Sequence, residues 1–465
     1  MITVSRRNAL LVGAGILGAG TGAILSLRTF DPAERRVPPL APGRKRWSNW
    51  SGLQSCEPAN IIVPESVEAL SNALPTVATP IRPVGAGHSF TPLVPTTGTI
   101  VSLDRLHKVE LDSEFVATVG TGTRLYALGE ALEQKGASLE ALPDINRQTL
   151  AGAISTATHG TGIAFGSLSE IIQELTLVKA DGTTLRCNTE SNTDAFHAAR
   201  VSLGALGVLV EAKLRAVPIF KLKRNTWFEP VEQTIDTALQ KAQQHRHFEF
   251  YYVTFTGMAY CISHDLTSEP ISPVQQNPEN DSVEDLMTLR NWLSWAPSLR
   301  KMVAQDMIRN EPSETRVGVP WRILSTDRPR RFNEMEFHLP REAIGTCLRE
   351  IITAIERHNE VYYPIEVRFI GKDTAWLSPF YERESASIAV HMGHTQNHDF
   401  YYSEIEPIFL KHGGRPHWGK LHSRTAADFA TMYPKWKQFL EIRNELDPKG
   451  HFLNAHLKSL FETAT

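Results

Sequence analysis

The sequence predicts an α+β protein built from two folded domains, and three observations support this fold class. Residues 47–220 alternate short β segments, glycine-rich turns and amphipathic helices. Near residue 221 the composition changes, because aromatic residues become frequent and most of the 17 histidines lie between His245 and His456. A chain of 465 residues also exceeds the usual length of one domain.

The overall composition excludes several classes of protein. Lys and Arg number 48 against 51 Asp and Glu, so the chain lacks the basic surplus of a protein that neutralises nucleic-acid phosphates. Hydrophobic residues make up 42% and charged residues 21%, which provides enough apolar side chain for folded cores. The 4 cysteines have no close spacing, so we expect no zinc motif, redox motif or disulfide framework.

The N-terminal segment has the pattern of an export signal. Residues 9–27 contain no charged side chain and follow Ser5-Arg6-Arg7, which is typical of the twin-arginine route. The stretch is just long enough to span a bilayer. We therefore predict that residues 1–36 are a signal or membrane anchor with a linker. The protein would be periplasmic or extracellular, or anchored in the membrane and facing outward.

An alternative interpretation of the same segment is a dinucleotide site. Gly13, Gly15 and Gly18 satisfy the G-x-G-x-x-G fingerprint of a Rossmann domain, and Asp31 follows them. A Rossmann helix needs a polar face, whereas residues 19–27 are almost wholly apolar. This composition disfavours an NAD enzyme and favours the export signal.

Glycine-rich segments punctuate the first folded unit. A predicted strand at 81–84 runs into a turn at 85–89, where glycine allows positive φ and exposed amides can form an anion nest. A second glycine turn ends the strand at 116–123, and a third segment, 151–162, is rich in small and hydroxylated residues that suit a phosphate ligand. Each alone is also compatible with a plain turn. The other elements predicted here are a strand at 61–63, helices at 66–74, 125–135 and 195–201, a hairpin at 174–187, and a closing segment at 203–209.

The second unit contains the residues with the most distinctive chemistry. Glu366 and Arg368 are two apart in a predicted strand, so they share one face; they form either a surface ion pair or a pair aimed into a cavity. A turn at 413–422 combines a tryptophan, a lysine and two histidines. The elements predicted here are strands at 245–253, 332–339, 364–370 and 387–391, a loop at 265–285, helical pieces at 286–308 broken by Pro297, and a helix at 341–357. A further helix is predicted at 439–446, beyond this unit.

Together these features resemble a flavoenzyme superfamily. Residues 82–89, 152–162 and 203–210 resemble the FAD-binding domain of the vanillyl-alcohol oxidase / p-cresol methylhydroxylase superfamily. The Glu-x-Arg strand and the His-Trp-Gly-Lys-x-His turn resemble its sugar-lactone and alditol oxidase branch, and the resemblance covers about residues 47 to 460. It implies a two-domain FAD-binding fold of the p-cresol methylhydroxylase type. The FAD domain would span 47–220, a cap domain of one sheet plus helices would span 221–425, and 426–465 would return to the FAD domain.

The resemblance also implies a cofactor site for FAD. His88 would carry the flavin covalently through its 8-methyl group, although several relatives hold FAD without this bond. The residues implied as cofactor-binding are Gly85, Ala86, Gly87, His88, Ser89, Gly120, Gly152, Ser155, Thr158, His159, Gly160, Val208 and His417.

Catalytic roles follow from the same resemblance. Glu366 would bind substrate hydroxyls, and Arg368 would stand near the flavin. Lys420 would stabilise the reduced, anionic flavin, and His391 would lie in the same cavity as a candidate proton acceptor. The implied reaction is oxidation of an aldono-1,4-lactone, with O2 reduced to H2O2 or with another electron acceptor. The alternatives are an alditol oxidase and a noncatalytic exported sugar-binding protein.

Three histidines near residue 391 raise the alternative of a metal site. His391, His394 and His398 have a spacing that suits ligands on a helix. However, the preceding run is rich in β-formers, and Gly393 disfavours a helix. The sequence therefore predicts no bound metal and no nucleic-acid partner.

Overall fold

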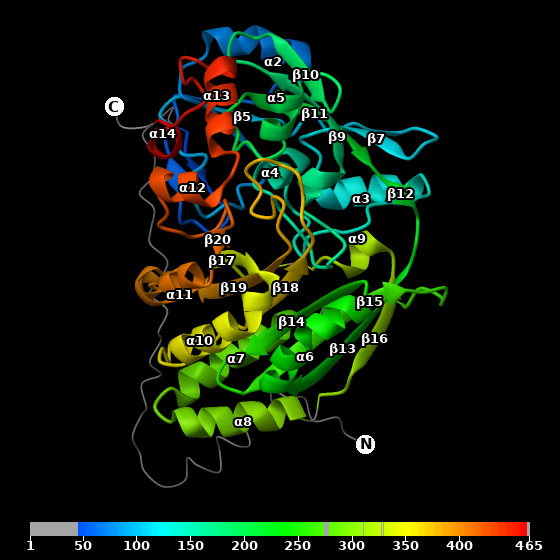
Figure 1. The fold of residues 1–465 in the computed structure, drawn as a ribbon, viewed down its shortest axis with the longest axis vertical. Coiled ribbons are helices and arrows are strands. Elements are labelled where there is room, and N and C mark those ends of the chain that lie inside the picture. The colour runs from blue at the N-terminus through cyan, green and yellow to red at the C-terminus, as the bar shows by residue number, and fades with distance from the viewer. Residues whose placement is uncertain (1–44, 274–278, 310, 327, 329, 463–465) are drawn as a thin grey trace.

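The computed structural model describes residues 45–273, 279–309, 311–326, 328 and 330–462 (Figure 1). The predicted signal and the alternative glycine fingerprint at 13–18 lie outside the described residues. Within these ranges, no helix has both the length and the apolar character needed to cross a bilayer.

Two sheets form the framework of the first domain. The predicted hairpin is present, with strand pairing that brings Thr184 opposite Val178 across the turn at Gly182, where φ is +82°. Helix α3 (Leu125–Gln134) buries Leu125, Leu128 and Leu132, as its periodicity predicts. The small parallel sheet has the order β3 (Asn60–Ile62), β5 (Thr99–Ser102), β4 (Ile81–Val84), and the antiparallel sheet has the order β10 (Thr184–Asn188), β9 (Ile172–Val178), β11 (Val208–Arg215), β7 (Val116–Gly120), β6 (Val109–Leu111). Helices α2 (Val67–Ala73) and α5 (Thr193–Ala199) also belong to this domain.

One predicted glycine turn is partly wrong. Residues Leu150–Ser155 form the short helix α4, and Gly152 lies inside it. The Thr149 side chain caps this helix by accepting a hydrogen bond from the Gly152 amide at 3.2 Å. The cap explains why a segment rich in small residues begins as a helix, and the irregular backbone follows only after Thr156.

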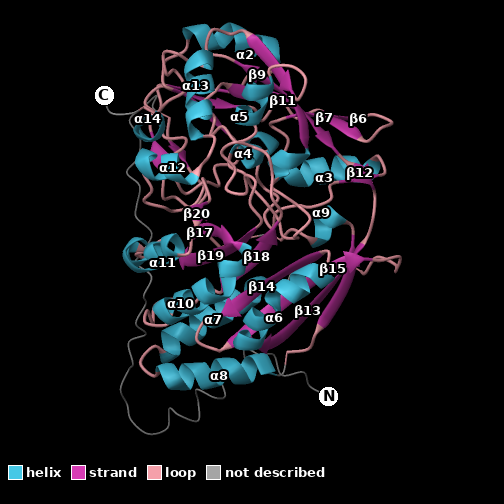
Figure 2. Ribbon diagram, viewed as in Figure 1, coloured by secondary structure: helices cyan, strands magenta, loops and turns pink. Residues whose placement is uncertain are grey.

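The second domain is built on an eight-stranded antiparallel sheet. Helices α6 (Val231–Gln244) and α10 (Ile344–Ile355) cover one face, where their apolar side chains share a core with the strands (Figure 2). The loop predicted at 265–285 is wrong at its end, because α7 (Glu279–Leu293) begins there and is followed by α8 (Pro297–Arg309). The sheet order is β16 (Glu314–Gly318), β13 (Leu222–Pro230), β15 (Met258–Leu266), β14 (His247–Val253), β18 (Ile365–Ile370), β19 (Ser385–Gly393), β17 (Phe332–Pro340), β20 (Arg415–Pro416).

The C-terminal helices pack with the first domain. Phe429, Phe439 and Phe461 are buried in the same core as Leu125 and Leu128, and Figure 1 shows their helices beside the N-terminal elements. These helices are α12 (Ala426–Met432), α13 (Trp436–Leu446) and α14 (Ala455–Phe461). In sequence, the second domain thus lies between two parts of the chain that share one core.

Candidate active site

A cavity of about 2120 Å³ lies where the two domains meet. Its lining combines the glycine turn after β4, the helix α4 and polar side chains from the large sheet. Ligand cavities are usually about 300–1,000 Å³. The volume therefore leaves room for a large cofactor together with a substrate.

The turn after β4 has the properties of an anion-binding site. A Cβ on Gly85 would lie 2.2 Å from the Thr149 Oγ1, and Gly87 has a φ of +68°, so both positions require glycine. In the described chain, the amides of Gly87, His88 and Ser89 donate no hydrogen bond to another residue. Amides left free along a cavity wall suit the pyrophosphate of a dinucleotide.

A further polar atom of the cavity wall has no partner within the described residues. The Gln148 Oε1 is buried and lines the cavity without a hydrogen bond. A buried acceptor without a donor is costly, so this atom suits a ligand with an N–H or O–H group. Together with the free amides, it shows that the wall fits FAD.

His88 is held in its neutral form at the cavity wall. Burial lowers its pKa to about 4, and the positive charges of Lys420 and Arg124 act in the same direction. Its ring centroid lies 5.2 Å from that of Trp50, and neither ring nitrogen has a hydrogen-bond partner in the described chain. A neutral imidazole with a free lone pair is a competent nucleophile.

Most of the predicted cofactor-binding residues line the cavity, but three do not. A Cβ on Gly120 would lie 2.6 Å from the Leu106 carbonyl oxygen, and one on Gly160 would lie 2.3 Å from that of Leu142, so these glycines serve backbone packing. Val208 is buried in a core below the cavity. The predicted residues that do line it are Gly85, Ala86, Gly87, His88, Ser89, Gly152, Ser155, Thr158, His159 and His417, and the unpredicted neighbours Gly122, Gly207 and Leu209 line it as well.

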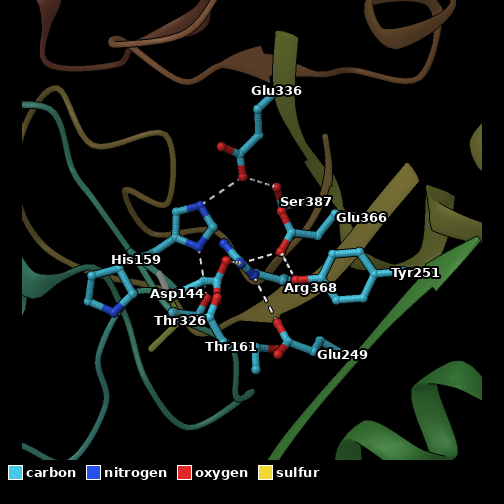
Figure 3. Close-up of polar contacts among 12 residues, drawn as sticks. Asp144, His159, Thr161, Glu249, Tyr251, Thr326, Glu336, Glu366, Arg368 and Ser387 are labelled. Carbon is cyan, nitrogen blue, oxygen red and sulfur yellow. Dashed lines mark hydrogen bonds and ion pairs between the residues drawn. The ribbon is translucent and has the colours of Figure 1, made fainter. Parts of the chain in front are cut away.

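Glu366 and Arg368 point into the cavity from β18, as their shared face predicts. They are 5% and 8% exposed, and Arg368 pairs directly with Glu366. The Arg368 Nε also donates to Glu249 at 3.0 Å, and the Arg368 Nη2 lies 3.7 Å from an Asp144 carboxylate oxygen (Figure 3). The Tyr251 hydroxyl donates to Glu366 at 2.6 Å. Three carboxylates thus surround one guanidinium.

This arrangement sets the charges of the cluster. Burial alone would lower the pKa of Arg368, but Glu366 and Glu249 raise it well above its usual value. Burial raises the pKa of Glu249 to about 7, against the influence of Arg368. Burial would also raise the pKa of Asp144, but Arg328 and Arg368 lower it. The cluster therefore holds one carboxyl group that titrates near neutral pH.

Lys420 and His391 face the cavity from the neighbouring strands and turn. Lys420 pairs with Glu334, and its ammonium lies 5.4 Å from the centroid of Phe90. The His391 Nδ1 lies 3.3 Å from the Pro364 carbonyl oxygen, and its Nε2 lies 3.7 Å from Glu334. The four predicted catalytic residues therefore all line one cavity.

The three histidines with ligand-like spacing do not lie on one helix. His391 lies in β19, which ends at Gly393, so His391, His394 and His398 do not share a helix face.

Sequence reasoning missed five acidic or phenolic residues of the site. Each lies across the sheet or cavity from a predicted residue. The signal available in the sequence was the spacing of polar side chains two residues apart along a strand. In β14, Glu249 and Tyr251 are two apart, and in β17 two carboxylates interrupt an apolar strand at the same spacing. The missed residues are Asp144, Tyr251, Glu334 and Glu336, which line the cavity, and Glu249, which contacts Arg368.

Comparison with known proteins places this site in a family. Residues 212–460 match the family model described as D-arabinono-1,4-lactone oxidase, which is more than half of the chain. The chain belongs to the D-arabinono-1,4-lactone oxidase family. Residues 58–188 of this lactone oxidase family member also match a model described as an FAD binding domain. The protein is therefore an FAD-dependent oxidoreductase, and the family resemblance inferred from the sequence is confirmed.

Curated relatives and solved structures agree with this family. The L-gulono-1,4-lactone dehydrogenase of Mycobacterium tuberculosis is 36% identical over 426 residues, which cover 89% of this chain and 98% of the relative. The L-gulonolactone oxidase of Mus musculus is 31% identical over 432 residues, covering 90% and 98%. A cholesterol oxidase structure from B. sterolicum shares the fold, with a TM-score of 0.73 at 17% identity, covering 91% of this lactone oxidase family member and 100% of that chain.

Proposed function

We propose that the protein removes a hydride and a proton from a CH–OH group of an aldono-1,4-lactone. The observation that carries this proposal is the pairing, in one cavity, of a free-amide glycine turn with the Glu366–Arg368 cluster. FAD, when bound, accepts the hydride and passes its electrons to O2 or to another acceptor. The remaining work belongs to side chains of the cavity.

Glu366 and Arg368 would orient the lactone. The Glu366 carboxylate is fixed by Tyr251 and Arg368, so its remaining lone pairs are aimed at one position of the cavity. A fixed carboxylate beside a guanidinium binds neighbouring hydroxyl and carbonyl oxygens of one substrate. Lys420 would supply positive charge where negative charge develops during the reaction.

His391 would accept the hydroxyl proton. Its Nδ1 donates to the Pro364 carbonyl, which leaves the Nε2 lone pair facing the cavity. His391→Asn should lower kcat by about 10²- to 10⁴-fold with little change in substrate Kd. An unchanged kcat would remove His391 from this role.

His88 would carry the flavin through a covalent bond. Its neutral ring and free nitrogens support this role. Acid-precipitated wild-type protein should then stay yellow, and His88→Ala should release the flavin into the supernatant. A colourless wild-type pellet would show that FAD is held without a bond.

Anaerobic mixing with a panel of lactones and polyols tests the substrate class. Bleaching of the flavin absorbance by aldono-1,4-lactones supports the proposal, whereas bleaching by polyols alone favours an alditol oxidase. The second outcome has some support, since a Streptomyces alditol oxidase is 26% identical over 440 residues. Absence of bleaching by every compound would indicate a binding protein.

We further propose export by the twin-arginine route, on the strength of Ser5-Arg6-Arg7 and the apolar stretch at 9–27. A reporter fused to residues 1–46 should appear outside the cytoplasm. Replacing both Arg6 and Arg7 with lysine should stop this, and export that continues would exclude the route. Membrane extraction of the exported protein separates an anchored from a released form.

A further inference from the structure

A second polar cluster lies apart from Glu366 and Arg368, and two of its three members, His159 and Glu336, line the cavity. Glu336 and His338 are two apart in β17 and share a face, and His159 approaches them from the segment after α4. One ligand atom from each of the three residues lies within 4.8 Å of the others. All three side chains are buried, at 3%, 0% and 3% exposure for Glu336, His338 and His159.

The hydrogen bonds of His159 fix its tautomer. Its Nδ1 lies 2.8 Å from the Gly160 carbonyl oxygen, which can only accept, so this nitrogen carries a hydrogen. Its Nε2 lies 3.0 Å from the Glu336 Oε1 (Figure 3). In the neutral ring, a lone pair therefore faces a carboxylate oxygen. Such a contact needs a positive centre between the two atoms, either a second proton or a metal ion.

His338 offers ring nitrogens that no other residue of the described chain uses as hydrogen-bond partners. Neither of its ring nitrogens has a hydrogen-bond partner, although the side chain is fully buried. Its ring centroid lies 5.0 Å from that of His159, and Phe380 packs against it at 4.6 Å. Burial of an unpaired polar group is costly, so a ligand for one of these nitrogens would recover free energy.

We propose that His159, Glu336 and His338 form a binding site for a divalent transition metal, with Zn²⁺ as the best fit. Two imidazole nitrogens and one carboxylate oxygen are a donor set that Zn²⁺ accepts. The groups behind the ligands also fit, because metal-bound histidines commonly donate their other N–H to a carbonyl, and metal-bound carboxylates accept further hydrogen bonds. Here the Gly160 carbonyl and the Ser387 hydroxyl fill those positions.

The charges around the cluster leave Glu336 available to a cation. The Lys420 ammonium lies 3.9 Å from the Glu336 Oε2, but it pairs more closely with Glu334. A second group, Glu334 with Glu366 and His391, also meets the distance criterion. Its carboxylates are already paired with Lys420 and Arg368, so it is the poorer site.

Titration of the purified holoenzyme with Zn²⁺, in competition with a chromophoric chelator, tests the site. We expect one ion per chain. His338→Gln should weaken Zn²⁺ binding by more than about 100-fold, because even groups behind the ligands are worth about 10- to 100-fold. Ser387→Ala should fall in that smaller range. Co²⁺ should give a tetrahedral visible spectrum in wild type that His338→Gln lacks.

His264→Gln is the matched control. This histidine is also buried, at 2% exposure, and the charged groups that act on its pKa are His247 and Arg224 rather than a carboxylate. Its replacement should leave Zn²⁺ affinity unchanged. Absence of binding to the wild-type holoenzyme, or equal binding by His338→Gln, would overturn the proposal and leave a protonated His159–Glu336 pair. Because the readout is metal binding, the result is independent of lactone turnover.

Discussion

The buried carboxyl group of Glu249 gives a quantitative test of the electrostatics of the site. Burial raises its pKa from the usual 4.5 to about 7; Arg368 opposes this shift, while Glu366 and Asp144 reinforce it. A raised pKa means that the folded protein binds the proton more tightly than the unfolded chain does. The stability from the protonated group is therefore complete below about pH 4.5 and is lost as the pH rises through about 7.

The size of this loss follows from the two pKa values. A change of one pKa unit is worth about 1.4 kcal/mol, so the loss between 4.5 and about 7 is about 3 kcal/mol. A chain of 465 residues that unfolds as one unit has an unfolding entropy of about 1 kcal/mol/K. The Tm should therefore fall by about 3 °C over this pH range because of Glu249 alone.

Glu249→Gln removes the titration but keeps an oxygen that can accept from the Arg368 Nε. We expect the Tm difference, variant minus wild type, to increase by about 3 °C when the pH is raised from about 5 to about 8.5. Calorimetry of the holoenzyme measures this difference. The control is Glu229→Gln. Burial would raise the pKa of Glu229, but hydrogen bonds from Lys241 and Thr234 lower it. The Tm difference between Glu229→Gln and wild type should therefore not depend on pH in this range. Parallel curves for Glu249→Gln and wild type would refute the reasoning.

Three further predictions concern other parts of the site. Arg368→Lys should lower kcat/KM by at least about 100-fold in steady-state assays, because lysine lacks the planar fork that engages several carboxylates; near-normal kinetics would contradict this. Arg82→Met should lower the free energy of unfolding by about 3 kcal/mol or more in denaturant titrations, because the guanidinium donates to four buried carbonyl oxygens; a change below about 1 kcal/mol would argue against that network. Gly85→Ala should reduce the FAD content of purified protein, and adding Thr149→Ala should restore part of it by removing the Oγ1 at 2.2 Å; equal FAD content in wild type and Gly85→Ala would show that the clash is absorbed.

Local periodicity in the sequence predicts which residues share a face of a strand, but it does not predict contacts between distant parts of the chain. The two-residue spacing in β18 placed Glu366 and Arg368 on one face, and the structure shows both in the cavity. The contact between Glu249 and Arg368 could not be predicted from the sequence. It depends on the register of β14 against β18, which pairs residues 119 positions apart. A register of this kind depends on the whole sheet and has no local signal.

The glycine-rich segments show a second limit of prediction from the sequence. The sequence predicts a cofactor-binding role for all four glycines, but Gly85 and Gly87 line the cavity, whereas Gly120 and Gly160 pack against carbonyl oxygens of the chain. Both kinds of position disfavour a Cβ: Gly85 because of the Thr149 Oγ1 and Gly87 because of its positive φ, and the other two because of carbonyl oxygens of the chain. Only the three-dimensional arrangement distinguishes the two cases.

The insertion of the second domain has a consequence for biosynthesis. Arg82 donates to the Phe452 carbonyl, 370 residues later in the chain. At about 5–20 residues per second, that carbonyl is synthesised about 20–70 s after Arg82. Until then the first domain lacks three helices of its core, and its apolar surface stays open to chaperones or to aggregation. The core that supports the FAD site is therefore complete only after residues 426–461 have been synthesised.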